Sequence, residues 1–129
     1  MARLLVVDDE QDITEVLAQY LRRVGHEVLT AYGAEPALEL VDRQGRPDAV
    51  VLDVDLPGID GVELLRRLRQ RHPGLPALFV TVLWGGAAHA RIRATGAACL
   101  AKPCTPADLR DEVQRLLAPG GRDVARSAP

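Results

Sequence analysis

Aromatic residues, cysteine and lysine are scarce in this chain of 129 residues. Phe, Trp and Tyr together make up only 3% of it, and there are two cysteines. Cys99 and Cys104 have no partners at zinc-type spacing, and two cysteines cannot build a disulfide framework, so we expect reduced thiols. Among sixteen basic residues the single lysine is Lys102. Because arginine is otherwise preferred, this position indicates a need for a compact ammonium group.

The chain also lacks a block of basic residues and a long apolar run. Its formal net charge is −2, so it does not have the charge pattern of a nucleic-acid or membrane-surface binder, and we interpret the arginines within 66–71 as a solvated helix face. No segment approaches the roughly 18 apolar residues of a membrane span, and the run at 4–7 is too short for a signal peptide. We expect a cytoplasmic protein that binds neither nucleic acid nor membrane.

The apolar content that is present suffices for one domain. Hydrophobic residues make up 47% of the chain, and a domain of this size buries roughly two thirds of its unfolded surface. No internal repeat is evident. Because apolar periodicity ends near residue 118, we expect a single domain over residues 1–118 and a flexible tail over residues 119–129.

Strand-like apolar runs alternate five times with segments of helical periodicity. The predicted strands are 3–7, 26–31, 49–52, 76–81 and 98–101, and the helices that follow them begin near Asp12, Gly33, Asp60, Gly85 and Thr105. Right-handed crossovers place helices on both faces of a parallel sheet. The sequence therefore predicts an α/β fold, a doubly wound (βα)5 domain with a parallel five-stranded sheet.

Three of the helix starts carry capping-box patterns, formed by Asp12 with Glu15, Asp60 with Glu63, and Thr105 with Asp108. The segment 85–95 gives the weakest helix prediction. It begins with two glycines and contains one large apolar residue, Ile92. We expect that segment to be mobile.

Four of the five predicted strands end in a polar side chain. Asp8 and Asp9 follow the first strand, Asp53 the third, Thr81 ends the fourth, and Lys102 follows the fifth. The carboxyl ends of parallel strands meet at one edge of the sheet, where open α/β folds bind their ligands. We therefore expect these five side chains to converge. The second strand contributes nothing obvious, as expected for an edge strand.

Clustered carboxylates repel one another, and one lysine cannot neutralise three of them. A hard divalent cation can, and Mg²⁺ suits a site of carboxylate and carbonyl oxygens. With Mg²⁺ and Lys102 the formal charge of Asp8, Asp9 and Asp53 becomes about zero, so a phosphoryl group meets little repulsion. An aspartate in such a site is a plausible nucleophile toward phosphorus, with Lys102 and Thr81 as donors to the transferred group.

These motifs resemble the receiver domains of bacterial two-component response regulators, similar to the single-domain chemotaxis type. The resemblance covers about residues 2–118 and rests on four runs in order, which are Val6 to Glu10, Asp53 to Gly61, Thr81, and Lys102-Pro103. It implies a flavodoxin-like fold with strand order 2-1-3-4-5, an order the general rules for doubly wound sheets associate with this family.

The resemblance also implies a function. Asp53 would accept a phosphoryl group from a sensor histidine kinase or a histidine phosphotransfer protein. Mg²⁺ would be bound by Asp9, Asp53 and the backbone carbonyl of Asp55, with Asp8 acting mostly through water. Lys102 would pair with the phosphoryl group, Thr81 would move to bind it, and the Lys102-Pro103 bond would be cis. Such a domain is a switch and not a turnover enzyme, although it can load itself from small phosphodonors and slowly hydrolyse its acyl phosphate.

Two positions depart from the family pattern. Cys99 stands where these domains usually have Tyr or Phe, three residues before the lysine, so the usual aromatic switch is in doubt. Val82 follows Thr81 where a very small residue is usual, and we expect it to narrow access to the site. Trp84 is either a partly buried cover or a partner anchor.

Two other readings remain open. One is a degenerate receiver-fold interaction module that phosphorylation does not control, which Cys99 and Val82 favour. A more distant one is a haloacid-dehalogenase-like phosphatase, in which Asp53 would be the nucleophile and Asp55 the general acid. The resemblance further implies that residues 85–117 form the face for a downstream protein or for a self-dimer.

Overall fold

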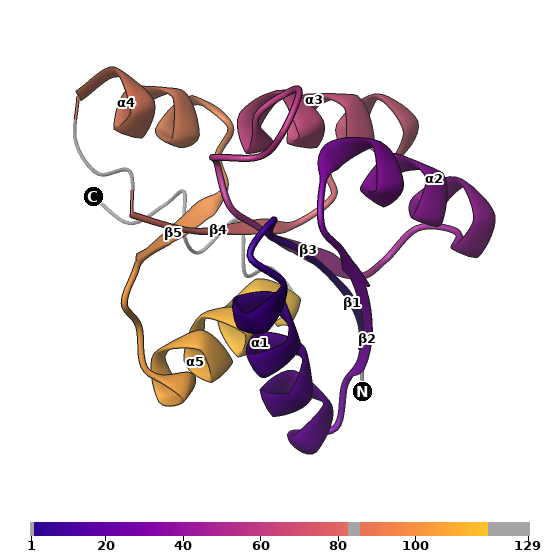
Figure 1. Ribbon diagram of the computed structural model, residues 1–129, viewed down its shortest axis with the longest axis vertical. Coiled ribbons are helices and arrows are strands. Elements are labelled where there is room, and N and C mark those ends of the chain that lie inside the picture. Colours follow the sequence, from indigo (N-terminus) through magenta and orange to yellow (C-terminus); the bar gives the residue numbers. More distant parts are fainter. Residues whose placement is uncertain (1, 83–85, 119–129) are drawn as a thin grey trace.

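The computed structural model describes residues 2–82 and 86–118 (Figure 1). Within them, five strands alternate with five helices as the sequence predicts. The strands are β1 (Arg3–Val7), β2 (Glu27–Ala31), β3 (Ala49–Leu52), β4 (Ala77–Thr81) and β5 (Ala98–Ala101). The helices are α1 (Gln11–Arg23), α2 (Ala34–Gln44), α3 (Gly61–Arg71), α4 (Gly86–Ala94) and α5 (Pro106–Leu117).

All neighbouring strands are parallel, and their order is β2-β1-β3-β4-β5, which confirms the predicted topology and the edge position of β2. The register aligns the carboxyl ends of the central strands. Val7 of β1 stands opposite Leu52 of β3, so the residues that follow, Asp8 and Asp53, leave the sheet side by side.

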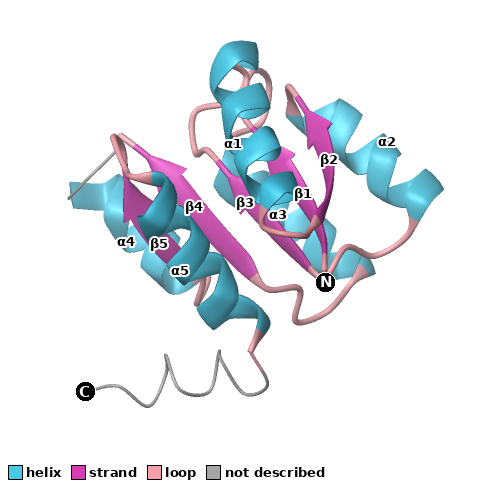
Figure 2. Ribbon diagram, turned by 90° about the horizontal axis from the view of Figure 1, so that it is seen from below, coloured by secondary structure: helices cyan, strands magenta, loops and turns pink. Residues whose placement is uncertain are grey.

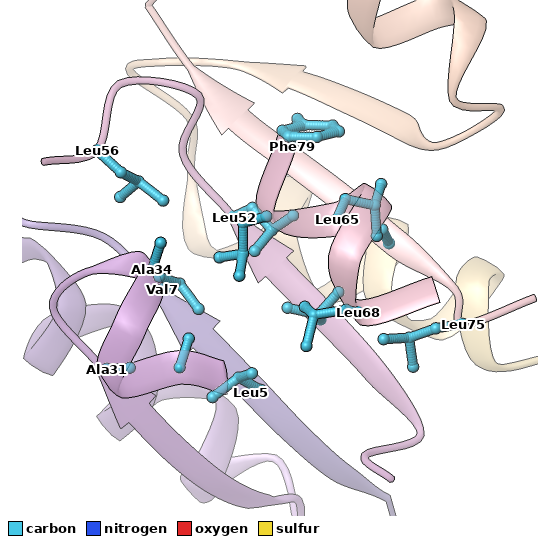
Figure 3. Packing of buried hydrophobic residues seen from close by; sticks show 14 of the residues in the cluster. Leu5, Val7, Ala31, Ala34, Leu52, Leu56, Leu65, Leu68, Leu75 and Phe79 are labelled. Carbon is cyan, nitrogen blue, oxygen red and sulfur yellow. The ribbon is translucent and has the colours of Figure 1, made fainter. Parts of the chain in front are cut away.

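The helices form a layer on each face of the sheet, with α1 and α5 on one side and α2, α3 and α4 on the other (Figures 1 and 2). Side chains of a strand alternate between faces, so β1 contributes to both cores. Leu4 and Val6 pack with α1 and α5, whereas Leu5 and Val7 pack with the other helices. Figure 3 shows the second core, in which Phe79 of β4 is completely buried.

The capping box predicted at Asp12 is wrong. Helix α1 begins two residues earlier than such a box requires, with Glu10 as the N-cap and no side-chain cap. The amide of Thr14 already donates to the carbonyl of Glu10, so Asp12 lies within the first turn, where its charge suits the helix dipole.

The other two capping predictions hold in different degrees. At α5 the full box is present, with reciprocal hydrogen bonds between Thr105 and Asp108. At α3 Asp60 accepts from the amide of Glu63 at 2.9 Å, but the Glu63 side chain does not reach back. Its carboxylate binds Arg66 instead, a competing partner one helical turn away.

Helix α4 forms as predicted, and Ile92 is its one buried residue. The prediction that 85–95 is mobile stays a prediction. Gly85, Trp84 and the predicted tail over residues 119–129 lie outside the described residues. Within the described part of the chain no helix combines the length and apolar character that crossing a membrane requires.

Candidate functional site

The backbones of β1 and β3 position two buried carboxylates at the carboxyl edge of the sheet. The amide of Asp53 donates to the carbonyl of Val7 at 3.0 Å, and the amide of Asp8 donates to Ala31 at 3.2 Å. Ladder-type hydrogen bonds thus continue one residue beyond each strand. Asp8 is 3% exposed and Asp53 is 7% exposed, so both carboxylates need partners within the fold.

Lys102 is the common partner of these two carboxylates. Its Nζ donates to Asp8 Oδ2 at 2.7 Å and to Asp53 Oδ2 at 3.2 Å. Burial acts to lower the pKa of Lys102, but the hydrogen bond to Asp8 and the charge of Asp53 outweigh it, so the pKa of the ammonium is raised above its ordinary value. The single lysine of the chain is therefore a firmly charged group at the centre of the site.

Asp9 completes a group that we call the acidic cluster, made of Asp8, Asp9 and Asp53. One carboxylate oxygen from each lies within 4.8 Å of the others. Asp9 is exposed, whereas the other two are buried. Hard oxygen donors at this spacing fit a divalent cation such as Mg²⁺ with part of its water shell retained. The donor set therefore matches the predicted metal.

The remaining oxygens of the buried carboxylates are held by backbone amides. Asp8 Oδ1 accepts from the amide of Glu10 at 3.0 Å. Asp53 Oδ1 accepts from the amide of Asp55 at 3.4 Å, beyond the usual range for such bonds. The backbone therefore holds Asp53 Oδ1 less tightly than Asp8 Oδ1. The side chain of Asp55 itself is exposed.

Thr81 ends β4 and is brought next to Lys102. Its carbonyl accepts from the amide of Lys102 at 3.0 Å, and the residue is completely buried. The structure thus gathers the predicted residues of strands β1, β3, β4 and β5 at one edge of the sheet. The Lys102-Pro103 peptide bond, at the start of the next loop, is cis, as the resemblance implied.

Two residues that support this edge were missed from the sequence. The Thr14 hydroxyl is fully buried and donates to the carbonyl of Asp8 at 2.8 Å, tying α1 to the end of β1. Gly61 begins α3 against the backbone of Asp53, and a Cβ there would collide with the Asp53 carbonyl oxygen. The role of Thr14 could have been predicted, because it is a polar residue on the face of the helix that otherwise carries apolar residues. For Gly61 the sequence offered only the Asp60-Gly61 pair at the start of the helix.

Cys99 and Val82 are the two positions that differ from the receiver-domain pattern, and the structure shows what surrounds each of them. Cys99 in β5 is partly buried against the core that faces α2, α3 and α4, and burial raises the pKa of its thiol. Val82 directly follows Thr81, and it is 66% exposed. Neither side chain forms part of the acidic cluster.

Comparisons with known proteins agree on one family. The family model described as "Response regulator receiver domain" matches residues 4–114. The transcriptional regulatory protein AfsQ1 of Streptomyces coelicolor is 47% identical over 81 residues, which cover 63% of this chain and 35% of that protein. The alkaline phosphatase synthesis transcriptional regulatory protein PhoP of Bacillus subtilis is 43% identical over 79 residues, or 61% and 32% of the two chains.

Solved structures give the same result over a larger part of the chain. The chemotaxis protein CheY4 of Vibrio cholerae superposes with a TM-score of 0.84 at 31% identity and covers 91% of this chain and 99% of that one. By contrast, the chain matches only about a third of the length of the curated relatives named above.

Proposed function

This chain belongs to the response regulator receiver domain family, and on that premise we propose that Asp53 is its phosphoacceptor. The protein then acts as a phosphorylation-dependent switch of a two-component system. The observation that carries the proposal is the position of Lys102 Nζ, within hydrogen-bond distance of both Asp8 and Asp53. A cation fixed beside a buried carboxylate is suited to receive the charge of an incoming phosphoryl group.

The proposed reaction is a single displacement at phosphorus. A carboxylate oxygen of Asp53 forms the new P–O bond while the P–N bond of a phosphohistidine breaks, and the departing imidazole nitrogen keeps the electron pair and gains a proton from solvent. Lys102 Nζ then donates to an oxygen of the transferred group. The buried Thr81 hydroxyl supplies a second donor once it turns toward that group.

Asp8, Asp9, Asp53 and the backbone carbonyl of Asp55 would hold Mg²⁺ in this site. Bound there, Mg²⁺ supplies positive charge that offsets the carboxylates and the phosphoryl oxygens. The spacing of the acidic cluster supports this assignment. Asp8 contributes mainly by holding Lys102, which it contacts at 2.7 Å.

The proposal extends to partners and location. The phosphodonor is a sensor histidine kinase or a histidine phosphotransfer protein, and the output is a downstream protein or a second copy bound at the 85–117 face, without direct contact to nucleic acid or membrane. The location is the cytoplasm, a reducing compartment, which the unpaired thiols of Cys99 and Cys104 support. The protein is a phosphoacceptor, and any self-phosphorylation or slow hydrolysis is secondary to that role.

A second candidate is a receiver-fold module that phosphorylation does not control. The observation that favours it is Cys99, whose small side chain packs against the core where the family usually has an aromatic ring. The phosphatase alternative is not retained, because the receiver family model accounts for residues 4–114.

Intact mass after incubation with acetyl phosphate and Mg²⁺ tests the proposal. We expect the wild type to gain about 80 Da, the mass of one phosphoryl group, and the gain to require Mg²⁺. Asp53→Asn should abolish it. Asp55→Asn is the matched control, because it removes a nearby carboxylate but keeps the backbone carbonyl, and it should keep the gain.

No gain in the wild type, or a gain that survives Asp53→Asn, would contradict the assignment and favour the module that phosphorylation does not control. In that case Val82→Ala is the next variant. Restored phosphorylation there would identify the Val82 side chain as the obstacle, whereas unchanged rates would remove the hypothesis that it narrows access.

A further inference from the structure

Helices α3 and α4 lie next to each other on one face of the sheet (Figure 1), and a groove of about 460 Å³ runs between them. We call it the α3–α4 groove. Its apolar lining comes from Val62 and Leu65 of α3 and from Ala94 of α4. On the α4 side the groove is lined by Arg91 and by the small side chain of Ala94, and Ile92 is the one buried residue of that helix. Its volume lies within the range of about 300–1,000 Å³ that is usual for binding pockets.

The α3–α4 groove has a basic rim. Arg66, Arg69 and Arg91 line it, together with one acidic residue, Glu63, so its lining carries a formal charge of +2. The whole chain has a formal charge of −2. The groove is therefore a local positive site on an acidic protein, and it attracts anionic partners.

The carboxylates around the rim are already shared among several arginines. Glu63 receives hydrogen bonds from both Arg66 and Arg67, at 2.5 and 3.0 Å. Arg91 of α4 pairs with Asp60 at the start of α3, at 2.8 Å. These exposed pairs are weak and exchange readily with other carboxylates. A ligand carboxylate can thus join Arg66 or replace Asp60 on Arg91 without leaving a buried charge unpaired.

We propose that the α3–α4 groove is a docking site for an acidic amphipathic segment of a partner protein. One apolar side chain of the segment fills the space over Val62 and Ala94, and its carboxylates pair with Arg66 and Arg91. Arginine is enriched at protein interfaces and pairs with carboxylates through two parallel hydrogen bonds. The positive charge of the rim and the volume of the groove both favour this occupant.

A nucleic acid fits the same groove less well. Its phosphates would satisfy the arginines, but its bases would meet an aliphatic floor, because the described residues that line the groove include no aromatic side chain for stacking. The proposed site also lies apart from the acidic cluster and shares no residue with it. The proposal therefore does not depend on phosphorylation of Asp53.

Fluorescence anisotropy with the full chain tests the proposal. The probe is a labelled helical peptide with leucines recurring at i and i+4 and glutamates at its other surface positions, and a peptide with lysine in place of glutamate is its counterpart. We expect the glutamate peptide to bind and the lysine peptide not to bind. The double variant Arg66→Gln/Arg91→Gln should weaken its binding by about tenfold or more, as expected for central arginines of an interface.

Two further variants separate the groove from general electrostatic attraction. Ala94→Leu fills the floor without changing any charge, and it should also weaken binding by about tenfold or more. Ala90→Leu, on an exposed position of α4 outside the lining, and Arg115→Gln, which breaks the comparable exposed pair with Glu112, should leave the affinity unchanged. Thermal unfolding of each variant checks that it is folded.

Four results would overturn the proposal. Equal binding of the lysine peptide, or no binding of the glutamate peptide at submillimolar concentration, would show that the groove does not select acidic segments. Unchanged affinity in Ala94→Leu would show that only surface charge is involved. Binding of a single-stranded oligonucleotide that competes with the peptide and is tighter would assign the arginines to nucleic acid instead.

Discussion

Lys102 is placed where its side chain meets two buried carboxylates and its backbone meets Thr81. An isolated buried carboxylate is costly, and two that face each other are more so. The ammonium offsets one of the charges held by Asp8 and Asp53, and Asp9 adds a third. At the scale of single residues, the acidic cluster is thus under-neutralised by the protein alone, and its three carboxylates could hold a divalent cation.

This charge balance predicts that Lys102→Met increases Mg²⁺ affinity while it slows phosphorylation. The metal would lose a repulsive neighbour, worth on the order of tenfold or more in affinity for charges a few ångströms apart at a partly buried site. The phosphoryl group would lose a donor. Isothermal titration calorimetry with Mg²⁺ gives the affinity, and intact mass against time gives the rate. Arg115→Met, which removes an exposed cation outside the cluster, is the control, and unchanged or weaker Mg²⁺ binding in Lys102→Met would contradict the account.

Gly61 supports the site through close backbone packing. A Cβ at this position would lie 2.9 Å from the carbonyl carbon of Asp53, and the Gly61 amide donates to Val54 at 2.7 Å, so neither backbone has room to shift. We expect Gly61→Ala to lower the free energy of unfolding by about 1–3 kcal/mol, as overpacking does, and to slow phosphorylation.

Gly33→Ala is the matched control for that variant. A Cβ at Gly33 would meet Pro36 at 3.7 Å, an ordinary contact, so the variant should cost only the preference of a helix N-cap for glycine over alanine, at most about 1 kcal/mol. Urea unfolding measures both variants. Equal stability of the two would show that the approach of Gly61 to Asp53 is not restrictive.

At the scale of helices and strands, the sequence predicts the features that depend on neighbouring residues. It does not predict the features that depend on contacts between distant residues. The strands and the convergence of four strand ends follow from apolar runs and from the shared direction of parallel strands, which are local or general. The order of the strands in the sheet was implied only by the resemblance to receiver domains. The box of Thr105 with Asp108 is local too. The start of α1 was misplaced because Thr14 hydrogen-bonds the carbonyl of Asp8, a contact that only the folded chain makes.

The side chain of Glu63 at α3 was also not predictable from the local pattern. It can bind either the backbone amide at the helix start or the side chains of Arg66 and Arg67, and the two arginines compete successfully. Hydrogen bonds from Arg66 and then Arg67 hold the pKa of Glu63 at about 2, below its ordinary 4.5. Because the folded pKa is the lower one, the stabilisation that the carboxylate contributes is complete above pH 4.5 and is lost as the pH falls toward 2.

We therefore expect Glu63→Gln to lower the urea midpoint at neutral pH, and the difference from wild type to shrink as the pH falls below 4.5. Molar salt should shrink it as well, because the pairs are exposed. Glu112→Gln, which disrupts the similar pair with Arg115 on α5, shows how much a single exposed pair contributes. A difference that is independent of both pH and salt would contradict the ion-pair explanation.

On the scale of the whole molecule, charge is arranged in two separate places. The acidic cluster lies at the carboxyl edge of the sheet, and the basic rim of the α3–α4 groove lies between two helices on one face. Repulsion within the cluster opposes folding in the absence of metal, whereas Mg²⁺ that bound only to the native state would stabilise it.

Asp9→Asn separates these two effects, because Asp9 is exposed and makes the third charge of the cluster. We expect the variant to have a higher thermal midpoint than wild type without metal, and to lose most of the Mg²⁺-dependent rise. In wild type, the free energy of unfolding should increase by about 2.7 kcal/mol when free Mg²⁺ is a hundredfold above its dissociation constant. Asp12→Asn, outside the cluster, should keep the rise, and an Asp9→Asn variant that also keeps it would exclude Asp9 as a ligand.

The most direct test of the central claim is to map the phosphorylated residue chemically. After loading with acetyl phosphate and Mg²⁺, borohydride delivers hydride to the carbonyl carbon of an acyl phosphate, phosphate leaves, and further reduction turns the aspartate into homoserine. The account predicts homoserine at position 53 and nowhere else. Homoserine at position 8 or 9, or none at any position in a protein that has taken up phosphate, would contradict it.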